Sequence, residues 1–119
     1  MDNKQLGQFG EEYTASYLAD KGYRILTRNY RTRYGEIDII AMQDDTVVFI
    51  EVKARRSRIY GEPKEAVSSR KQQRLITTAL IYLQENKWEE KACRFDVVEV
   101  VFLANGTVKP HHIENAFSQ

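Results

Sequence analysis

The sequence predicts an α/β or α+β protein in which helices cover one mixed β-sheet. Two long segments carry apolar residues at helical spacing. Five shorter runs are rich in β-branched and aromatic residues and are separated by polar or glycine-containing turns. The order along the chain is therefore α-β-β-β-α-β-β, with strands on both sides of the second helix.

The two predicted helices span residues 3–21 and 65–86. Asn3 is a suitable N-cap for the first helix, and Gly22 is a natural end for it. One face of each helix is apolar and is expected to pack on the sheet. These faces contain Leu6, Phe9, Gly10, Tyr13 and Tyr17 in the first helix and Leu75, Ile76, Ala79, Leu80 and Leu83 in the second.

Five strands are predicted, at residues 23–30, 36–42, 46–53, 94–103 and 108–113. The second and third strands flank a short polar turn and form a hairpin. Asn105-Gly106 predicts a second hairpin turn, between the last two strands. Residues 31–35 and 54–63 are expected to be loops.

Length and composition limit the class of protein. The chain has 119 residues, of which 42% are hydrophobic and 29% charged, so we expect one globular domain over residues 1–119. Cys93 is the only cysteine, which excludes an internal disulfide and fits a reducing compartment. The sequence has no apolar run near the ~20 residues of a membrane span, and its first residues lack an apolar signal core. We therefore expect a cytoplasmic protein without a membrane partner.

The net charge is only +1, but the charges are arranged in blocks. Residues 24–35 contain four arginines and no acidic residue, and residues 53–74 contain eight basic and two acidic residues. Between them, residues 36–52 contain five acidic residues and no basic one. A functional interpretation has to explain why an acidic block lies between two basic blocks.

The acidic block contains two carboxylates that the first hairpin can bring together. With a two-residue turn at Asp44-Asp45, Asp38 lies opposite Glu51. Opposed Cβ atoms in a sheet are ~4.5–5.5 Å apart, so these carboxylates repel each other unless a cation lies between them. Mg²⁺ binds one or two carboxylates together with water and phosphate oxygens. The pattern predicts a divalent-metal site at Asp38 and Glu51, with the Val52 carbonyl as a further candidate ligand, if no longer turn shifts the register.

Lys53 follows Glu51 by two residues, so both side chains lie on one face of the strand. Its ammonium can contact a phosphate or orient water beside the metal, and the same register places it opposite Glu36. Glu36 is then either a further acid of the site or the ion-pair partner of Lys53. The alternative for the whole set is a solvated strand face, although both carboxylates of the pair lie in very apolar runs, IDII and VVFIEV.

The basic blocks supply side chains that can hold a nucleic-acid backbone. The candidate contacts are Arg31, Arg33, Arg55, Arg56, Arg58, Arg70, Lys71 and Arg74. Lys71 lies four residues before Leu75, in line with the buried face of the second helix. It therefore either reaches the edge of the site or extends over the sheet as an ordinary surface lysine.

Three polar residues near the C-terminus have simpler interpretations. His111-His112 suggests a metal site, but consecutive strand residues face opposite ways and cannot easily share one ion. A surface or turn position is therefore expected for both histidines. Asp96 follows the start of a strand, where solvation or a salt bridge is expected.

Two runs of this sequence resemble a known nuclease core. Gly35-Glu36-Ile37-Asp38-Ile39-Ile40 and the later Val48-Phe49-Ile50-Glu51-Val52-Lys53-Ala54-Arg55 resemble the PD-(D/E)XK nuclease core. Ile37-Asp38 replaces the usual Pro-Asp, and the E-x-K half is intact. Together with Gly7-Gln8-Phe9-Gly10-Glu11-Glu12 and Arg94-Phe95-Asp96-Val97-Val98, they make the chain similar to the YraN family of small bacterial proteins, over roughly residues 6–102.

This resemblance implies a restriction-endonuclease-like αβββαβ core, similar to that of archaeal Holliday-junction resolvases. In those relatives the aspartate and the glutamate bind a divalent metal and the lysine assists the water, and these roles fall on Asp38, Glu51 and Lys53. Junction resolvases also carry a glutamate on the first helix, before a Lys-Gly-aromatic end. That end is Lys21-Gly22-Tyr23 here, and the matching glutamate is Glu11.

We therefore expect a Mg²⁺- or Mn²⁺-dependent endonuclease that hydrolyses phosphodiester bonds of branched or single-stranded DNA. A homodimer is compatible with this expectation, because the junction-resolving relatives are dimers. Two alternatives remain open. One is a nucleic-acid-binding module without turnover on a nuclease-like scaffold, and the other is a protein-interaction domain. The intact Asp, Glu and Lys set argues against the interaction domain but is compatible with the binding module.

Overall fold

The structure is a computed structural model that describes residues 1–57 and 67–118. The elements of the described part, in chain order, are α1 (Asn3–Asp20), β1 (Arg24–Thr32), β2 (Gly35–Gln43), β3 (Thr46–Ser57), α2 (Ser69–Glu85), β4 (Cys93–Leu103) and β5 (Val108–Phe117). This order confirms the expected fold class, with the αβββαβ core followed by one further strand. The Asn105-Gly106 turn joins β4 to β5, and Gly106 has a left-handed φ of 87°.

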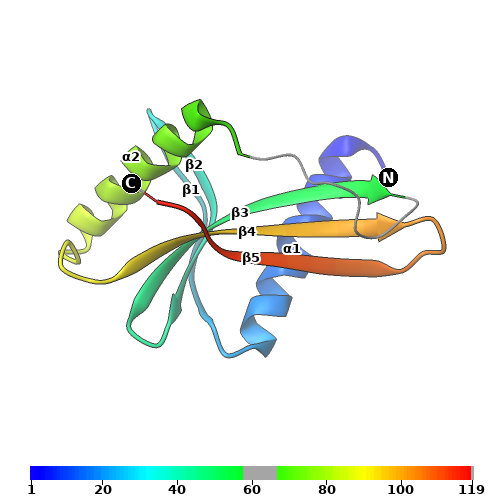
Figure 1. Cartoon of the computed structure of the whole chain (residues 1–119), viewed down its shortest axis with the longest axis horizontal. Helices are drawn as coiled ribbons and strands as arrows, with labels where there is room; N and C mark the ends of the chain where they lie inside the picture. The colour runs from blue at the N-terminus through cyan, green and yellow to red at the C-terminus, as the bar shows by residue number, and fades with distance from the viewer. Residues whose placement is uncertain (58–66, 119) are drawn as a thin grey trace.

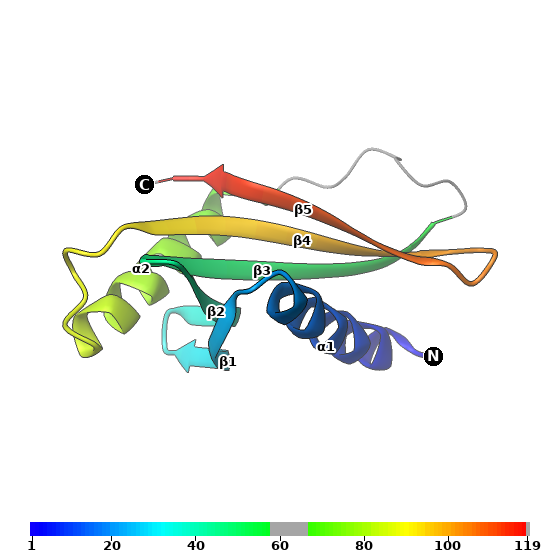
Figure 2. The same cartoon turned by 90° about the horizontal axis from the view of Figure 1, so that it is seen from below.

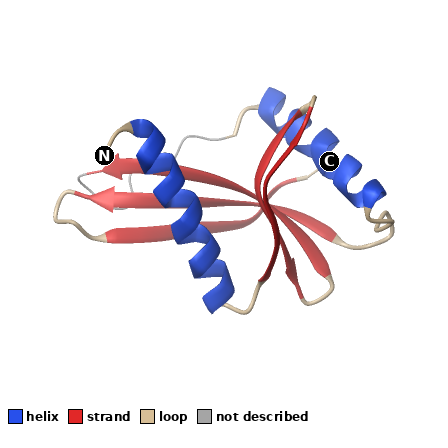
Figure 3. Ribbon diagram, turned by 180° about the vertical axis from the view of Figure 1, so that it is seen from behind, coloured by secondary structure: helices blue, strands red, loops and turns tan. Residues whose placement is uncertain are grey.

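All five strands form one sheet in the order β1-β2-β3-β4-β5. β3 and β4 are parallel, and the other neighbouring pairs are antiparallel. A parallel pair needs a crossover connection, which here includes α2. The sheet is strongly twisted, so that β1 and β2 run across the direction of the long strands β3, β4 and β5 (Figure 3).

The two helices pack on opposite faces of this sheet (Figures 1 and 2). The core on the α1 side contains Leu18, Tyr23, Ile39, Ala41, Val48, Ile50, Val98 and Val100. The core on the α2 side contains Ile37, Ile40, Met42, Val47, Phe49, Leu75, Ile76, Ala79, Tyr82, Leu83 and Phe95. The apolar runs of β2 and β3 are thus buried on both faces, which is why they do not alternate with polar residues.

The N-cap of α1 differs from the predicted one. Asp2, not Asn3, caps this helix through a capping box. The Asp2 carboxylate accepts a hydrogen bond of 2.8 Å from the Gln5 backbone, and the Gln5 side chain accepts one of 2.9 Å from the Asp2 backbone. Because both hydrogen bonds of the capping box are formed, Asp2 is the N-cap and Asn3 is the first residue of the helix.

Two predicted boundaries near the acidic block are also wrong. Residues 54–57 are not a loop, because they continue β3 and pair with β4 up to Ser57 opposite Leu103. α2 begins later than predicted, after the N-cap Ser68, whose side chain accepts a hydrogen bond from the Lys71 backbone. The predicted loop residues 58–63, and residues 65–66 of the predicted helix, lie outside the described residues. Neither helix of the described part has the length and apolar character needed to cross a membrane.

Candidate functional site

The β2–β3 hairpin carries the predicted pair of carboxylates. Its strands pair in the predicted register as far as Ile39 opposite Ile50. Regular pairing stops one residue before Asp38 and Glu51 would face each other. Instead, Asp38 Oδ2 accepts a hydrogen bond of 2.8 Å from the backbone N–H of Val52. This bond holds the Asp38 carboxyl beside β3, close to Glu51.

The opposite edge of β2 is also irregular at Asp38. The β1–β2 register pairs Arg28 with Ile39 and Tyr30 with Ile37, so Asn29 lies opposite Asp38. Asn29 has a left-handed φ of 54°, a conformation that asparagine adopts more readily than most residues. Asp38 therefore lies where the pairing with both neighbouring strands is interrupted. Sequence reasoning missed Asn29, although an asparagine inside a strand was a usable signal.

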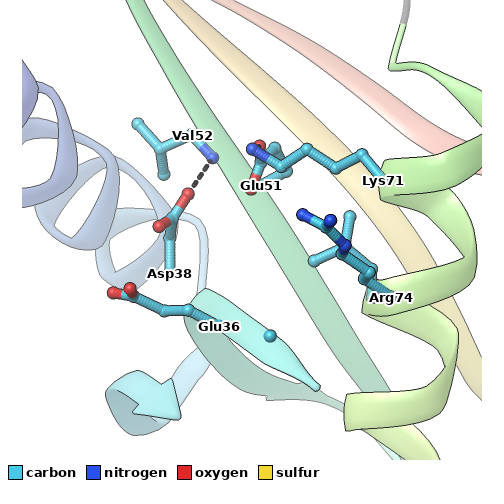
Figure 4. A pocket seen from close by; sticks show the side chains of 8 residues that line it. Glu36, Asp38, Glu51, Val52, Lys71 and Arg74 are labelled. Carbon is cyan, nitrogen blue, oxygen red and sulfur yellow. Dashed lines mark hydrogen bonds and ion pairs between the residues drawn. The ribbon is translucent and has the colours of Figure 1, made fainter. Parts of the chain in front are cut away.

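A pocket of about 340 Å³ opens beside the two carboxylates (Figure 4). We call it the carboxylate pocket, and it is lined by Gly35, Glu36, Asp38, Glu51, Val52, Lys71, Arg74 and Leu75. In Figure 4, Lys71 and Arg74 extend from α2 toward the strands, and Lys71 reaches Glu51. The pocket thus has acids on the strand side and basic groups on the helix side.

Asp38 and Glu51 are the more buried acids of the pocket, and Glu51 has a basic partner. Glu51 is 6% exposed and lies 2.5 Å from the Nζ of Lys71, measured from Glu51 Oε2. Lys71 itself is half-exposed, and its hydrogen bond to Glu51 raises its pKa. Burial, followed by repulsion from Glu51, raises the pKa of Asp38 to about 8, although the Val52 N–H opposes this rise. A proton or another cation beside Asp38 is therefore favourable.

This set of donors fits a small hard cation. Within residues 1–57 and 67–118, no three His, Cys, Asp or Glu side chains converge to enclose a metal ion by themselves. Mg²⁺ usually keeps several waters and takes only one or two carboxylates from a protein. The donors present, Asp38 and Glu51 with the backbone of Val52 beside them, meet that requirement for Mg²⁺ or Mn²⁺.

Lys53 and Glu36 are not paired as the register predicted. The Glu36 carboxylate contacts Arg31, with Nε and Oε2 3.2 Å apart. Lys53 is half-buried and lies in register with Glu99 of β4, and it is not one of the side chains that line the carboxylate pocket. The prediction assumed a ladder that continues to Glu36, whereas regular β2–β3 pairing ends at Ile39. Lys71 is the lysine that lines the pocket. Of the two positions considered for it, it takes the one at the edge of the site.

Glu11 faces a neighbouring pocket rather than the carboxylate pocket itself. This second pocket, of about 520 Å³, is called here the α1–β1 pocket and is lined by Asn3, Lys4, Gly7, Gln8, Glu11, Asn29, Arg31 and Glu36. In the amide orientation that its hydrogen bonds require, Asn29 donates to Glu11 Oε1 at 3.0 Å and to Glu36 Oε1 at 3.1 Å. Glu36 lines both pockets, so they meet at this residue. Glu11 is also near enough to add to the repulsion that raises the pKa of Asp38.

Three of the predicted nucleic-acid contacts line these pockets. Lys71 and Arg74 line the carboxylate pocket, and Arg31 lines the α1–β1 pocket. Arg70 is exposed in the first turn of α2. Arg58 lies outside the described residues. The basic residues near the pockets thus come from α2 on one side and β1 on the other.

Three further predicted contacts are arranged differently. Arg33 lies in the β1–β2 turn, with its guanidinium 4.9 Å from the centre of the neighbouring tyrosine ring. Arg55 of β3 forms an ion pair with the buried Glu99, with Nε and Oε2 3.0 Å apart. Arg56 is exposed and donates a hydrogen bond to the backbone carbonyl of Met1. Arg55 therefore balances a buried charge and is not an uncommitted cation.

A second polar cluster, centred on Asp96, is buried between the end of α1 and strands β4 and β5. Asp96 is 1% exposed and accepts hydrogen bonds from Arg94 at 2.8 and 2.9 Å and from the backbone N–H of Asn115 at 2.9 Å. The His112 ring lies between Asp96, at 2.7 Å, and the Tyr17 hydroxyl, at 3.1 Å. Burial opposes ionisation of Asp96, but the bonds from His112, Arg94 and the backbone keep its pKa below the ordinary value.

The position of His112 corrects the prediction. It is not a surface histidine, because the second half of β5, beyond the predicted residue 113, continues along β4 and holds the ring under α1. Asp96 does form the expected salt bridge, although inside the protein. The cluster connects α1, β4 and β5 and lies apart from both pockets, so we assign it to stability.

The fold and the site define an α+β protein with two carboxylates that face basic side chains across a pocket. The model of the family described as "Uncharacterised protein family UPF0102" matches residues 10–100. The chain is 47% identical to a UPF0102 protein of Syntrophomonas wolfei over 115 residues, covering 97% of this chain and 99% of the relative. It is 49% identical to a UPF0102 protein of Alkaliphilus oremlandii over 117 residues, with coverage of 97% and 99%. The chain therefore belongs to the UPF0102, or YraN, family, as the resemblance of its motifs indicated.

Among solved structures, the chain is similar to SfsA of Pyrococcus furiosus, determined in complex with Ca²⁺. The TM-score is 0.44 and the sequence identity is 17%. The match covers 95% of this chain and 64% of the SfsA chain.

Proposed function

We propose that this protein is a metal-dependent nuclease that hydrolyses phosphodiester bonds in nucleic acid, with DNA as the expected substrate. One observation carries the proposal: Asp38 and Glu51 lie together in a pocket whose other wall carries Lys71 and Arg74. Buried acids repel a phosphate, so a phosphate-binding role for this pocket requires a cation at the acids. The two basic side chains are placed to hold an anion at the rim.

Asp38 and Glu51 would hold Mg²⁺ or Mn²⁺, with the Val52 carbonyl as an additional candidate ligand. When bound, such an ion supplies Lewis-acid stabilisation of charge on the phosphate. Lys71 and Arg74 bind phosphate oxygens through their own N–H groups. The resemblance implies a water-orienting role for Lys53, two residues beyond Glu51 on β3, but the lysine that lines the pocket is Lys71. Glu11 acts from the second pocket, where Asn29 joins it to Glu36.

A cleavage assay tests this proposal. The substrates are labelled single-stranded, duplex, flap and four-way-junction DNA, each incubated with Mg²⁺, Mn²⁺ or EDTA. Asp38→Asn and Glu51→Gln keep the shapes of the side chains but remove the charges, so both should abolish metal-dependent cleavage. Asp45→Asn is the matched control, because Asp45 is an exposed acid in the turn of the same hairpin. Cleavage that survives in Glu51→Gln would contradict the assignment.

A nucleic-acid-binding module without turnover is the second candidate. The ion pair between Lys71 and Glu51 favours it, because an ammonium already neutralises one of the two acids. This candidate predicts salt-sensitive binding in EDTA and no metal-dependent product with any of the four substrates. Products that require Mg²⁺ or Mn²⁺ and the charge of Asp38 would exclude it.

A further inference from the structure

The α1–β1 pocket adjoins the carboxylate pocket but has different chemistry. It combines three amide side chains with two basic and two acidic ones, and its residues are Asn3, Lys4, Gly7, Gln8, Glu11, Asn29, Arg31 and Glu36. Its volume of about 520 Å³ lies within the about 300–1,000 Å³ of typical small-molecule sites. A ligand that suits it has both hydrogen-bonding edges and negative charge.

The packing of the protein does not require a glycine at position 7, which lines this pocket. A glycine inside a helix lowers stability relative to alanine, so it usually has a packing reason. Gly10 has one, because a Cβ there would lie 2.8 Å from the Cβ of Ala54 in β3. Gly7 has none, since a Cβ there would meet no atom within 4 Å. The space over Gly7 belongs to the pocket, where the bare backbone allows close approach of a ligand.

Several polar groups in the pocket remain available to a ligand. The two carboxylates, Glu11 and Glu36, already accept hydrogen bonds from Asn29, and Arg31 also contacts Glu36. Lys4 and Gln8 are exposed on α1, and their side chains form no hydrogen bond within the described residues. The pocket therefore offers a free amide and a free ammonium beside two acids, of which Glu36 is paired with Arg31.

The two pockets are joined at Glu36. In Figure 4 its carboxylate points away from Lys71 and Arg74, on the far side of Asp38 from α2. A ligand that binds a phosphate at Lys71 and Arg74 can therefore extend past Glu36 toward Gln8. The neighbouring part of a nucleic-acid strand is the natural occupant of the second pocket.

We propose that the α1–β1 pocket binds an unpaired nucleotide of the strand whose phosphate lies in the carboxylate pocket. This inference rests on the proposed function and adds its substrate class, a strand that is single-stranded next to the phosphate. Asparagine and glutamine amides match the hydrogen-bonding edges of bases, and the Watson–Crick edge is accessible only when the base is unpaired. Lys4 and Arg31 match the phosphates on either side of that nucleotide.

The test is a binding measurement in Ca²⁺, an ion that oxygen ligands hold and that compensates the acids of the carboxylate pocket. A gel run after each titration verifies that the strand is uncleaved. Fluorescence anisotropy is recorded with a labelled 12-nucleotide DNA strand and with the duplex of the same sequence. Gly7→Gln fills the pocket without meeting other side chains at its Cβ, and Gln8→Ala removes the free amide. Ser16→Gln is the control, because it adds the same side chain at an exposed position of α1 outside the pocket. Urea unfolding of each variant verifies that the fold is intact.

We expect Gly7→Gln to weaken binding of the single strand by about tenfold, since the hydrogen bonds to one base carry about that much affinity. Duplex binding should stay within about twofold, and Ser16→Gln should change neither value. Three results would overturn the subsite. Gly7→Gln could weaken binding of the single strand and the duplex equally, or it could leave the binding of both unchanged. The third result is that the wild-type protein does not bind the single strand. The cleavage assay is scored separately. Absence of metal-dependent products would refute the nuclease, while binding that depends on Gly7 would still establish the subsite.

Discussion

Asp38 allows the charge balance of the carboxylate pocket to be measured directly. Burial, then repulsion from Glu51, raises its pKa from 3.8 to about 8. A carboxyl group with a raised pKa binds more protons in the folded than in the unfolded protein. Its contribution to stability is therefore fully present below about pH 4 and is lost as the pH rises through about 8. The difference between the two pKa values limits this loss to on the order of 6 kcal/mol.

Asp38→Asn should remove most of this loss. The amide oxygen can still accept the hydrogen bond from Val52, so the change removes the charge and little else. Because the pocket is open to solvent and repulsion is partly screened, we expect the variant to be more stable than wild type by about 2–3 kcal/mol at pH 8. Near pH 5 the two proteins should differ by less than about 1 kcal/mol.

Urea unfolding in EDTA at pH 5, 6, 7 and 8 gives this comparison, with Asp45→Asn as a control that should follow wild type. A variant that is less stable than wild type at pH 8 would refute the reasoning. So would a difference between the proteins that does not change from pH 5 to pH 8. Addition of Mg²⁺ at pH 8 should stabilise wild type, because a ligand that binds only the folded state raises its stability. Asp38→Asn should lose most of that response.

Three further substitutions test other parts of the structure. Lys71→Met removes the ammonium beside Glu51, so we expect the free energy of unfolding to fall by about 1–2 kcal/mol; the effect is limited because Lys71 is half-exposed. Calorimetry should also show that the variant binds Mg²⁺ more tightly than wild type. Unchanged Mg²⁺ affinity would contradict this competition. Gly10→Ala should lower the free energy of unfolding by about 1–3 kcal/mol, although alanine has the better helix propensity, because the added Cβ would lie 2.8 Å from the Cβ of Ala54. A urea midpoint equal to or higher than that of wild type would contradict tight packing of α1 on β3. Asp96→Ala should lose about 3–5 kcal/mol by leaving buried partners uncompensated, and a fall in Tm of less than about 5 °C would count against that role.

The hairpin shows how far sequence reasoning reaches at this site. A two-residue turn and alternation were enough to predict the pairing that the structure has, down to Ile39 opposite Ile50. They were not enough to place Lys53, because alternation assumes a ladder that continues. The ladder stops where the Asp38 side chain takes the Val52 N–H and Asn29 adopts a left-handed φ. Both events depend on side-chain hydrogen bonds, which a pattern of apolar and polar residues does not encode.

The histidines show a different limit. Alternation correctly indicated that His111 and His112 face opposite ways. Whether the inward side is buried, however, depends on how far β5 continues along β4 and on where α1 ends above it. The Tyr17 hydroxyl and the Asp96 carboxylate meet the His112 ring from elements far away in the sequence. Contacts of this kind follow from the packing of α1 on the sheet and not from the local sequence.

The blocks of charge in the sequence acquire a meaning in the folded chain. Acids of the central block, Glu36, Asp38 and Glu51, line the pocket from β2 and β3, whereas Lys71 and Arg74 of the following basic block line it from α2. An anion in the pocket is attracted by the two basic side chains and repelled by the acids. A phosphate can occupy the pocket stably only if the charge of the acids is compensated, and one ammonium compensates one acid at most. Productive binding of the nucleic-acid phosphate proposed above therefore depends on a second positive charge beside Asp38.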